Sequence, residues 1–259
     1  MYKRQPHFFA VEPLGVKVEA EDHHFHIHHG TLESGKEIIL YESGDTVTEN
    51  AIMAASLIAG TTTFKYASSN YQVAELCYFL EKLGVKVDGV GGTTLTVHGV
   101  SEINTDIEYT LSEDPIDAMF FIASAIVTHS EITIARAPIE YLEVELLKLE
   151  KMGFEYTKTE PYLSTNGRTK LVDITTKPSR LLALEEKIYG RPYPGLNIDN
   201  LPFFAVIATA VKGTTLIHDW VYDGRAVHFM ELSKLGANMH LADPHRVYIT
   251  GPAELEPAD

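Results

Sequence analysis

Apolar and polar positions along this chain repeat as modules. An amphipathic run ending in Leu-Gly or Met-Gly surrounds Gly15, Gly84, Gly153 and Gly236. Recurrence at such intervals is the signature of a supersecondary unit copied along the chain. In the clearest copy the apolar residues fall on one stripe at helical spacing. We therefore predict a helix that packs with one face over 71–83, followed by a glycine C-cap with positive φ. The stripe contains Val73, Leu76, Cys77, Leu80 and Leu83.

A second kind of helix opens each complete copy. The runs 49–60, 117–128 and 200–213 are rich in small apolar residues and have no continuous polar face, so we expect helices buried on all sides. Strand-like segments follow each run, and alternating segments follow each glycine cap like hairpin strands. The sequence predicts an α/β fold of repeated βαβαββ units with buried helices surrounded by sheets.

The chain of 259 residues is long enough for two domains. The repeat changes phase near Asn104, which predicts a partial first domain at 1–104 (the tail of one unit plus one complete unit) and a partial second domain of two units at 105–259. Both ends look truncated, because part of a unit cannot bury its apolar face alone. We exclude residues 1–5 from functional interpretation, because MYKRQ is what sequencing-adapter read-through with a GTG start codon would encode.

Composition narrows the function classes. The net charge of −15 argues against nucleic-acid binding, which depends on Lys and Arg neutralising phosphates. The single cysteine, Cys77, excludes an internal disulfide, and its place on the helix stripe indicates an inert core thiol. No signal peptide and no apolar stretch of about 20 residues is present. A cytoplasmic protein without membrane association is expected.

Asp199 and Arg225 are the strongest candidates for chemistry. Asp199 precedes the opening helix of the last unit and suits either a helix N-cap or a carboxylate that contacts a substrate hydroxyl. Arg225 begins a surface helix, where the helix dipole disfavours a cation. Its charge would be compensated either by an anionic ligand or by a local carboxylate, Asp223 or Asp219.

Two further segments are weaker candidates. The loop with Ser43, Gly44, Asp45 and Thr46 precedes a helix, and its backbone N–H groups are suited to phosphate or a uridine ring edge, although the pattern of a P-loop is absent. The histidine run at 22–30 alternates with Phe25 and Ile27, which predicts a half-buried strand with histidines on its wet face. No ligand set is complete in the sequence, so no metal site is expected.

The motifs GDTVTENAIMAASLIAGTTTF, YPGLNIDNLPFF and WVYDGRAVHFMELSKLGA together resemble the UDP-N-acetylglucosamine 1-carboxyvinyltransferases, the enolpyruvyl transferases of peptidoglycan synthesis. The resemblance runs from about Pro6 to Pro257. It implies two domains of three βαβαββ units each, an inside-out α/β barrel, with substrates bound between them. It also implies transfer of the enolpyruvyl group of phosphoenolpyruvate to the 3-hydroxyl of UDP-N-acetylglucosamine, the first committed step of cell-wall synthesis, by a cytoplasmic enzyme that needs no metal or other cofactor and is monomeric when complete.

Site residues carry over from the resemblance position by position. Asp199 matches the aspartate that orients and deprotonates the sugar hydroxyl, and Arg225 matches the arginine that stabilises negative charge on the phosphoenolpyruvate side. Val221 matches a nucleotide contact, and His7 a histidine beside the uracil. The loop Ser43, Gly44, Asp45, Thr46 matches the nucleotide-binding loop, although Gly-Asp-Thr stands where the family has Ser-Val-Gly.

Alternatives stay open at this stage. The resemblance places a catalytic loop with a cysteine or aspartate before Pro6 and a phosphate-binding arginine after Asp259, so the chain alone is expected to be inactive. A transferase acting on shikimate 3-phosphate would share the architecture, and a non-catalytic paralogue that binds a nucleotide sugar is a different class. An RNA-terminal phosphate cyclase relative is disfavoured by the net charge of −15.

Overall fold

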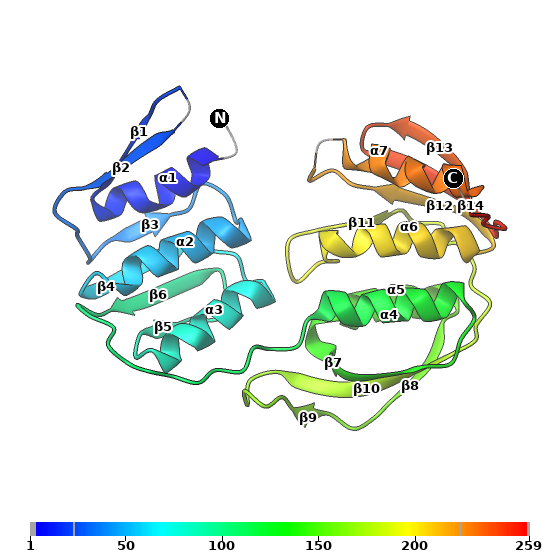
Figure 1. Ribbon diagram of the computed structural model, residues 1–259, viewed down its shortest axis with the longest axis horizontal. Helices are drawn as coiled ribbons and strands as arrows, with labels where there is room; N and C mark the ends of the chain where they lie inside the picture. The colour runs from blue at the N-terminus through cyan, green and yellow to red at the C-terminus, as the bar shows by residue number, and fades with distance from the viewer. Residues whose placement is uncertain (1–3, 23, 223, 258–259) are drawn as a thin grey trace. The chain divides into compact units, whose positions relative to one another are not determined.

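The computed structural model describes residues 4–22, 24–222 and 224–257 (Figure 1). It divides into two compact units, of which the first ends at Leu111 and the second begins at Ser112. The boundary expected at Asn104 lies inside the segment 101–114, which contains no helix or strand. Residues in such a connection carry no periodic pattern, so the sequence could not locate the division more closely.

The first unit contains one complete repeat. Its sheet has the order β3-β4-β6-β5, in which β3 and β4 are parallel and the other neighbours antiparallel. The predicted βαβαββ unit is thereby confirmed. Its elements are β3 (Glu37–Ile39), α2 (Asp45–Ser56), β4 (Gly60–Lys65), α3 (Tyr71–Lys82), β5 (Lys86–Asp88) and β6 (Thr94–Gly99).

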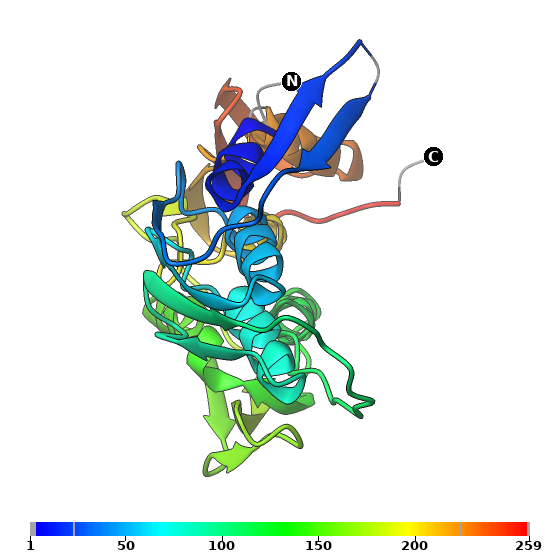
Figure 2. The same ribbon diagram turned by 90° about the vertical axis from the view of Figure 1, so that its left-hand side faces the viewer.

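A shorter group of elements precedes this repeat. Helix α1 (Gln5–Val11) packs on α2, and η2 (Glu12–Leu14) leads into the antiparallel hairpin of β1 (Val16–Ala20) and β2 (Phe25–His29), drawn beside α1 in Figure 2. The ring of Phe25 packs on Phe8 of α1 with 5.0 Å between centroids. Ile27 is 66% exposed, so the prediction of a half-buried strand is wrong at this position. The contact with α1 covers Phe25 and does not extend to Ile27.

The second unit contains two repeats. The strand order of the later one, β11-β12-β14-β13 with β11 and β12 parallel, matches that of the first unit, while the earlier sheet has the order β7-β10-β8 with β9 on β10. The earlier elements are α4 (Pro115–Val127), β7 (Thr133–Pro138), η3 (Ile139–Tyr141), α5 (Glu143–Met152), β8 (Glu155–Lys158), β9 (Tyr162–Leu163) and β10 (Lys170–Lys177). The later ones are β11 (Ile188–Tyr189), η4 (Ile198–Asn200), α6 (Leu201–Ala210), β12 (Gly213–His218), α7 (Arg225–Phe229), η5 (Met230–Leu235), β13 (Asn238–Asp243) and β14 (Arg246–Gly251).

The amphipathic helix α3 packs as its sequence predicts. Val73, Cys77 and Leu80 are buried, and the glycine caps Gly84 and Gly153 have φ of 91° and 100°. Burial raises the pKa of the Cys77 thiol to about 12, so a reactive thiolate is not formed at neutral pH. The interpretation of Cys77 as a core thiol is confirmed.

The opening helices are less uniformly buried than their composition predicts. Helix α6 has no exposed position, but Met53 of α2 is 46% exposed and Phe120 of α4 is 50% exposed. The buried residues of α4 pack towards α6, β7 and β10, which cover one side of this helix and not its whole circumference. None of the helices in the described part of the chain has the length and apolar character needed to cross a membrane.

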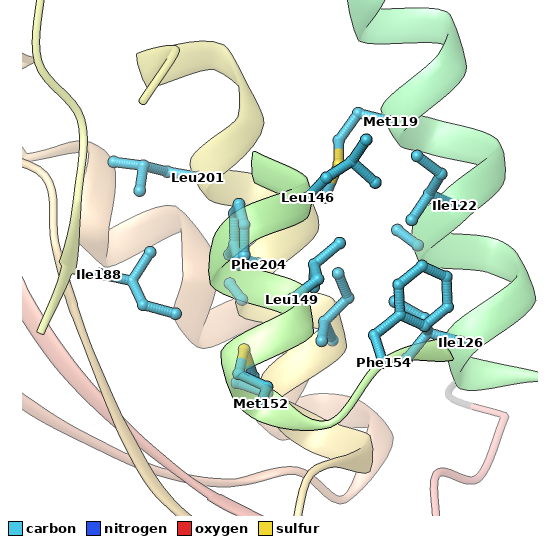
Figure 3. Packing of buried hydrophobic residues seen from close by; sticks show 14 of the residues in the cluster. Met119, Ile122, Ile126, Leu146, Leu149, Met152, Phe154, Ile188, Leu201 and Phe204 are labelled. Carbon is cyan, nitrogen blue, oxygen red and sulfur yellow. The ribbon is translucent and has the colours of Figure 1, made fainter. Parts of the chain in front are cut away.

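One continuous core joins the helices of the second unit (Figure 3). Met119 and Ile122 of α4 meet Leu146 and Leu149 of α5, and Phe204 of α6 belongs to the same cluster. Side chains in such interiors are close-packed, so displacement of one helix disturbs the others. The core therefore fixes α5 against the start of α6, directly after the turn η4 that contains Asp199.

Candidate functional site

The structure brings Asp199 and Arg225 into contact. Arg225 opens α7, and its Nη1 donates to Oδ1 of Asp199 at 3.3 Å. Its Nη2 donates to the carbonyl oxygen of Ile198 at 2.6 Å. The Asp199 side chain is 52% exposed, whereas that of Arg225 is 19% exposed. Asp199 and Arg225, the two strongest candidates in the sequence, are therefore in direct contact, and Asp199 is the more exposed of the two.

Asp219 holds Arg225 from the inner side. Its side chain is fully buried and accepts from Nε of Arg225 and from the backbone N–H of Tyr222, the latter at 3.4 Å. Its backbone N–H donates to the carbonyl oxygen of His245 at 2.8 Å. The guanidinium also lies 4.6 Å from the centre of the Tyr222 ring. Of the local carboxylates expected to compensate Arg225, Asp219 does so, while Asp223 lies outside the described residues.

Glu145 of α5 fixes the turn that carries Asp199. This carboxylate is buried, and its Oε1 accepts from the backbone N–H of Asn197 at 3.0 Å and from Nδ2 of Asn200 at 2.9 Å. The Asn197 side chain in turn accepts from the backbone N–H of Asp199 at 2.9 Å. Asn197 is thus the cap of the turn η4, so interpreting Asp199 as the N-cap is wrong.

Sequence reasoning missed Glu145, although a signal was present. Leu146, Leu149 and Met152 form the buried stripe of α5, and Glu145 stands on that stripe at helical spacing. A charged residue on an apolar stripe needs hydrogen-bond partners inside the fold. The partners come from the turn at 197–200, which the sequence alone could not place beside α5.

Val221 lies on the exposed side of the same segment. It is 43% exposed, and its neighbour Trp220 donates from Nε1 to the carbonyl oxygen of Gly190 at 2.8 Å. A Cβ atom at Gly190 would lie 2.9 Å from Cα of Ile198, so only glycine permits this close approach of the two backbones. The Trp220 and Gly190 contacts therefore hold the Val221 segment against the turn that carries Asp199.

The segment Ser43 to Thr46, expected as a nucleotide-binding loop, lies in the first unit, and the loop assignment is wrong for Asp45 and Thr46, which form the start of α2. Ser43 Oγ donates to the carbonyl oxygen of Ala67 at 3.3 Å, and Gly44 immediately precedes α2. The Asp45 carboxylate accepts from Ser68 Oγ and from Asn70 Nδ2. The side chain of Asp45 is thus committed to tying the loop to the segment before α3. Thr46, in contrast, is exposed.

His7 lies on α1 and contacts the same helix that the loop precedes. Nδ2 of Asn50, in the second turn of α2, donates to Nδ1 of His7 at 2.8 Å. This contact requires the His7 tautomer with an unprotonated Nδ1. His7 therefore contacts the N-terminal half of α2, the half that contains Asp45 and Thr46.

Replacing Glu145 with glutamine should change how stability depends on pH. Burial raises the pKa of Glu145 above 4.5, outweighing the hydrogen bonds that favour its ionised form. A carboxyl whose folded pKa is raised stabilises the fold fully below its unfolded pKa, and this stabilisation is lost as pH rises through the folded pKa. The free energy of unfolding of the wild type should therefore fall relative to Glu145→Gln from about pH 4.5 upwards.

Urea denaturation at a series of pH values from below to above about 4.5 measures the difference in unfolding free energy between the wild type and Glu145→Gln. Glu143→Gln, on the exposed side of the same helix, controls for the removal of one negative charge. A difference between the wild type and Glu145→Gln that does not vary with pH would contradict the prediction.

Removing the guanidinium of Arg225 should strongly destabilise the second unit. In Arg225→Met the buried Asp219 carboxylate loses its charged partner, which costs about 3–5 kcal/mol of unfolding free energy. Adding Asp219→Asn should recover much of the loss. The control is Arg246→Met, whose arginine is 52% exposed in its ion pair with Asp243, so that solvent screens the pair and its loss should change stability little. Thermal denaturation measures both variants. Equal losses of stability in Arg225→Met and Arg246→Met would refute the role of Arg225 as the charged partner of the buried Asp219.

Comparison with known proteins identifies the fold and the family. The sequence matches the family EPSP synthase (3-phosphoshikimate 1-carboxyvinyltransferase) over residues 4–259. It is 35% identical over 249 residues to the UDP-N-acetylglucosamine 1-carboxyvinyltransferase of Treponema denticola, and 31% identical over 253 residues to that of Treponema pallidum. These alignments cover 96% and 98% of the chain but 57% and 58% of the two relatives.

Solved structures have the same architecture. The enolpyruvyl transferase NikO from Streptomyces tendae superimposes with a TM-score of 0.80 at 18% identity, over 98% of this chain and 60% of that one. An EPSP synthase from Acinetobacter baumannii gives a TM-score of 0.70 at 16% identity, over 96% of this chain and 56% of that one. The fold class predicted from the repeats is confirmed, and the chain belongs to the EPSP synthase family of enolpyruvyl transferases.

Proposed function

We propose that this chain forms part of an enzyme that transfers the enolpyruvyl group of phosphoenolpyruvate to the 3-hydroxyl of UDP-N-acetylglucosamine. The curated relatives at 30–35% identity carry that name, which favours this substrate over shikimate 3-phosphate. The contact between Asp199 and Arg225 is the observation that carries the proposal, because it puts a carboxylate and a guanidinium at one accessible place.

Asp199 would accept the proton of the sugar hydroxyl. Its carboxylate is the exposed member of the cluster, and its backbone is held by Asn197, so the side chain is free to turn while its position stays fixed. A general base must come within about 2.6–3.2 Å of the proton donor. The sugar hydroxyl would therefore replace Nη1 of Arg225 as the partner of Asp199.

Arg225 would remain in place through Asp219 and stabilise negative charge. The hydroxyl oxygen adds to C2 of the enolpyruvyl group while a proton adds to its methylene carbon. The resulting adduct loses phosphate from C2 and a proton from the methyl carbon, which restores the double bond. A guanidinium fixed beforehand needs no reorganisation to stabilise the developing charge.

We assign contacts with the nucleotide to Ser43, Gly44, Thr46, His7 and Val221. The carboxylate of Asp45 is engaged by Ser68 and Asn70, so its contribution would come from its backbone N–H. With these contacts the chain should bind the nucleotide sugar.

Titration of the 259-residue chain with UDP-N-acetylglucosamine tests the proposal. We expect binding by isothermal titration calorimetry, and Asp199→Asn should weaken it by about tenfold, equivalent to one charge-assisted hydrogen bond. The matched control is Asp106→Asn, at an exposed position of the segment 101–114 that contains no helix or strand. Shikimate 3-phosphate should not compete.

Two results would contradict the proposal. Binding of shikimate 3-phosphate without binding of the nucleotide sugar would assign the chain to the other branch of the family. Equal affinity of Asp199→Asn and the wild type for UDP-N-acetylglucosamine would remove Asp199 from the site. Phosphate release by the chain with both substrates would refute only the expectation that the chain alone is inactive.

A further inference from the structure

One face of the hairpin of β1 and β2 carries histidines, glutamates and Lys17. In its antiparallel register Lys17 pairs with His28 and Glu19 pairs with His26. Directly paired residues point to the same face of a sheet, and the period of two puts His24 on that face as well. The backbone N–H of Glu21 donates to the carbonyl oxygen of His24 at 2.9 Å, which continues the pairing into the turn.

Three of these side chains converge at the end of the hairpin. Nε2 of His24 and Nε2 of His26 lie 2.9 Å apart. A Glu21 oxygen lies 3.0 Å from Nε2 of His24, and the other lies 3.3 Å from Nε2 of His26. All three ligand atoms lie within 4.8 Å of one another, and the side chains are between 45% and 59% exposed. The pattern of the sequence had not predicted that the turn brings Glu21 to the two imidazoles.

We infer that Glu21, His24 and His26 bind a divalent transition-metal ion, of which Zn²⁺ fits the donor set. Two imidazole nitrogens and one carboxylate form a ligand set that zinc accepts with water in the remaining position. In tetrahedral zinc sites, ligand atoms at about 2.0–2.1 Å from the ion are separated by roughly 3.3 Å. The separations of 2.9–3.3 Å come close to this before any ion is present.

The proton balance of binding follows from the contact between the two rings. In a neutral pair one Nε2 carries the hydrogen that the other accepts, so one of the two lone pairs is occupied. Zinc takes the place of that hydrogen. The ring that loses the hydrogen from Nε2 takes one up on Nδ1 by exchange with solvent, so both rings stay neutral and Glu21 supplies one negative charge. Binding of zinc involves no change of oxidation state. It uses none of the residues Asp199, Arg225 and Asp219.

The proposed ligands lie on the face of the hairpin that takes no part in hydrophobic packing. The other face of the hairpin carries Phe25, which packs on Phe8. The imidazoles of His24 and His26 contact each other and the Glu21 carboxylate, and the ring of His28 is stacked on that of His26 with 6.1 Å between centroids. An ion would thus cross-link the strand β2 to the preceding turn and restrict the opening of the hairpin end.

Calorimetric titration of the untagged 259-residue chain with ZnCl₂ tests the site. One equivalent of Zn²⁺ should bind. His24→Ala, His26→Ala and Glu21→Gln should each weaken binding by at least about tenfold, since even changes in groups that only orient a ligand cost 10–100-fold in metal affinity. The matched control is His29→Ala, which removes an imidazole from the opposite face of the same strand and should keep the affinity of the wild type.

A second readout separates ligation from loss of structure. The visible spectrum of bound Co²⁺ should indicate four-coordination in the wild type and in His29→Ala, and this signature should be absent in His26→Ala. Far-ultraviolet circular dichroism should be unchanged in all variants, because the replaced side chains are exposed. Absence of Zn²⁺ binding, or equal weakening by His29→Ala and His26→Ala, would overturn the inference.

Discussion

The buried carboxylate of Asp219 is the constraint on which the candidate site depends. A charge without exposure to water needs a partner, and Arg225 is the cation that reaches it. Because Arg225 is held there, its other N–H groups reach the Asp199 side chain and the Ile198 carbonyl. An arginine at a helix N-terminus, which looks misplaced in the sequence, is therefore an anchor for the acid that stands before α6.

Two polar networks converge on the turn that carries Asp199. Glu145 holds this turn from α5 through Asn197 and Asn200, and Arg225 holds it from α7. Both networks rest on the core shared by α4, α5 and α6, which is the product of the repeated unit. The repeat supplies a rigid frame, and two buried acids and one arginine position the turn that carries Asp199.

Much of the fold could be predicted because periodicity is local. The stripe of α3, the glycine caps and the βαβαββ order all follow from residues close together in sequence. Side-chain partners between distant segments could not be predicted, which is why Glu145 was missed and Asp199 was open to interpretation as a cap. The exposure of Ile27 and Phe120 was missed for the same reason, since composition does not say how much of an element its neighbours cover.

A crystal structure of the chain with bound UDP-N-acetylglucosamine tests the central claim most directly. The account predicts a sugar hydroxyl within about 2.6–3.2 Å of the Asp199 carboxylate, with Arg225 still paired to Asp219. A nucleotide sugar bound with no atom near Asp199, or an Arg225 released from Asp219, would contradict it.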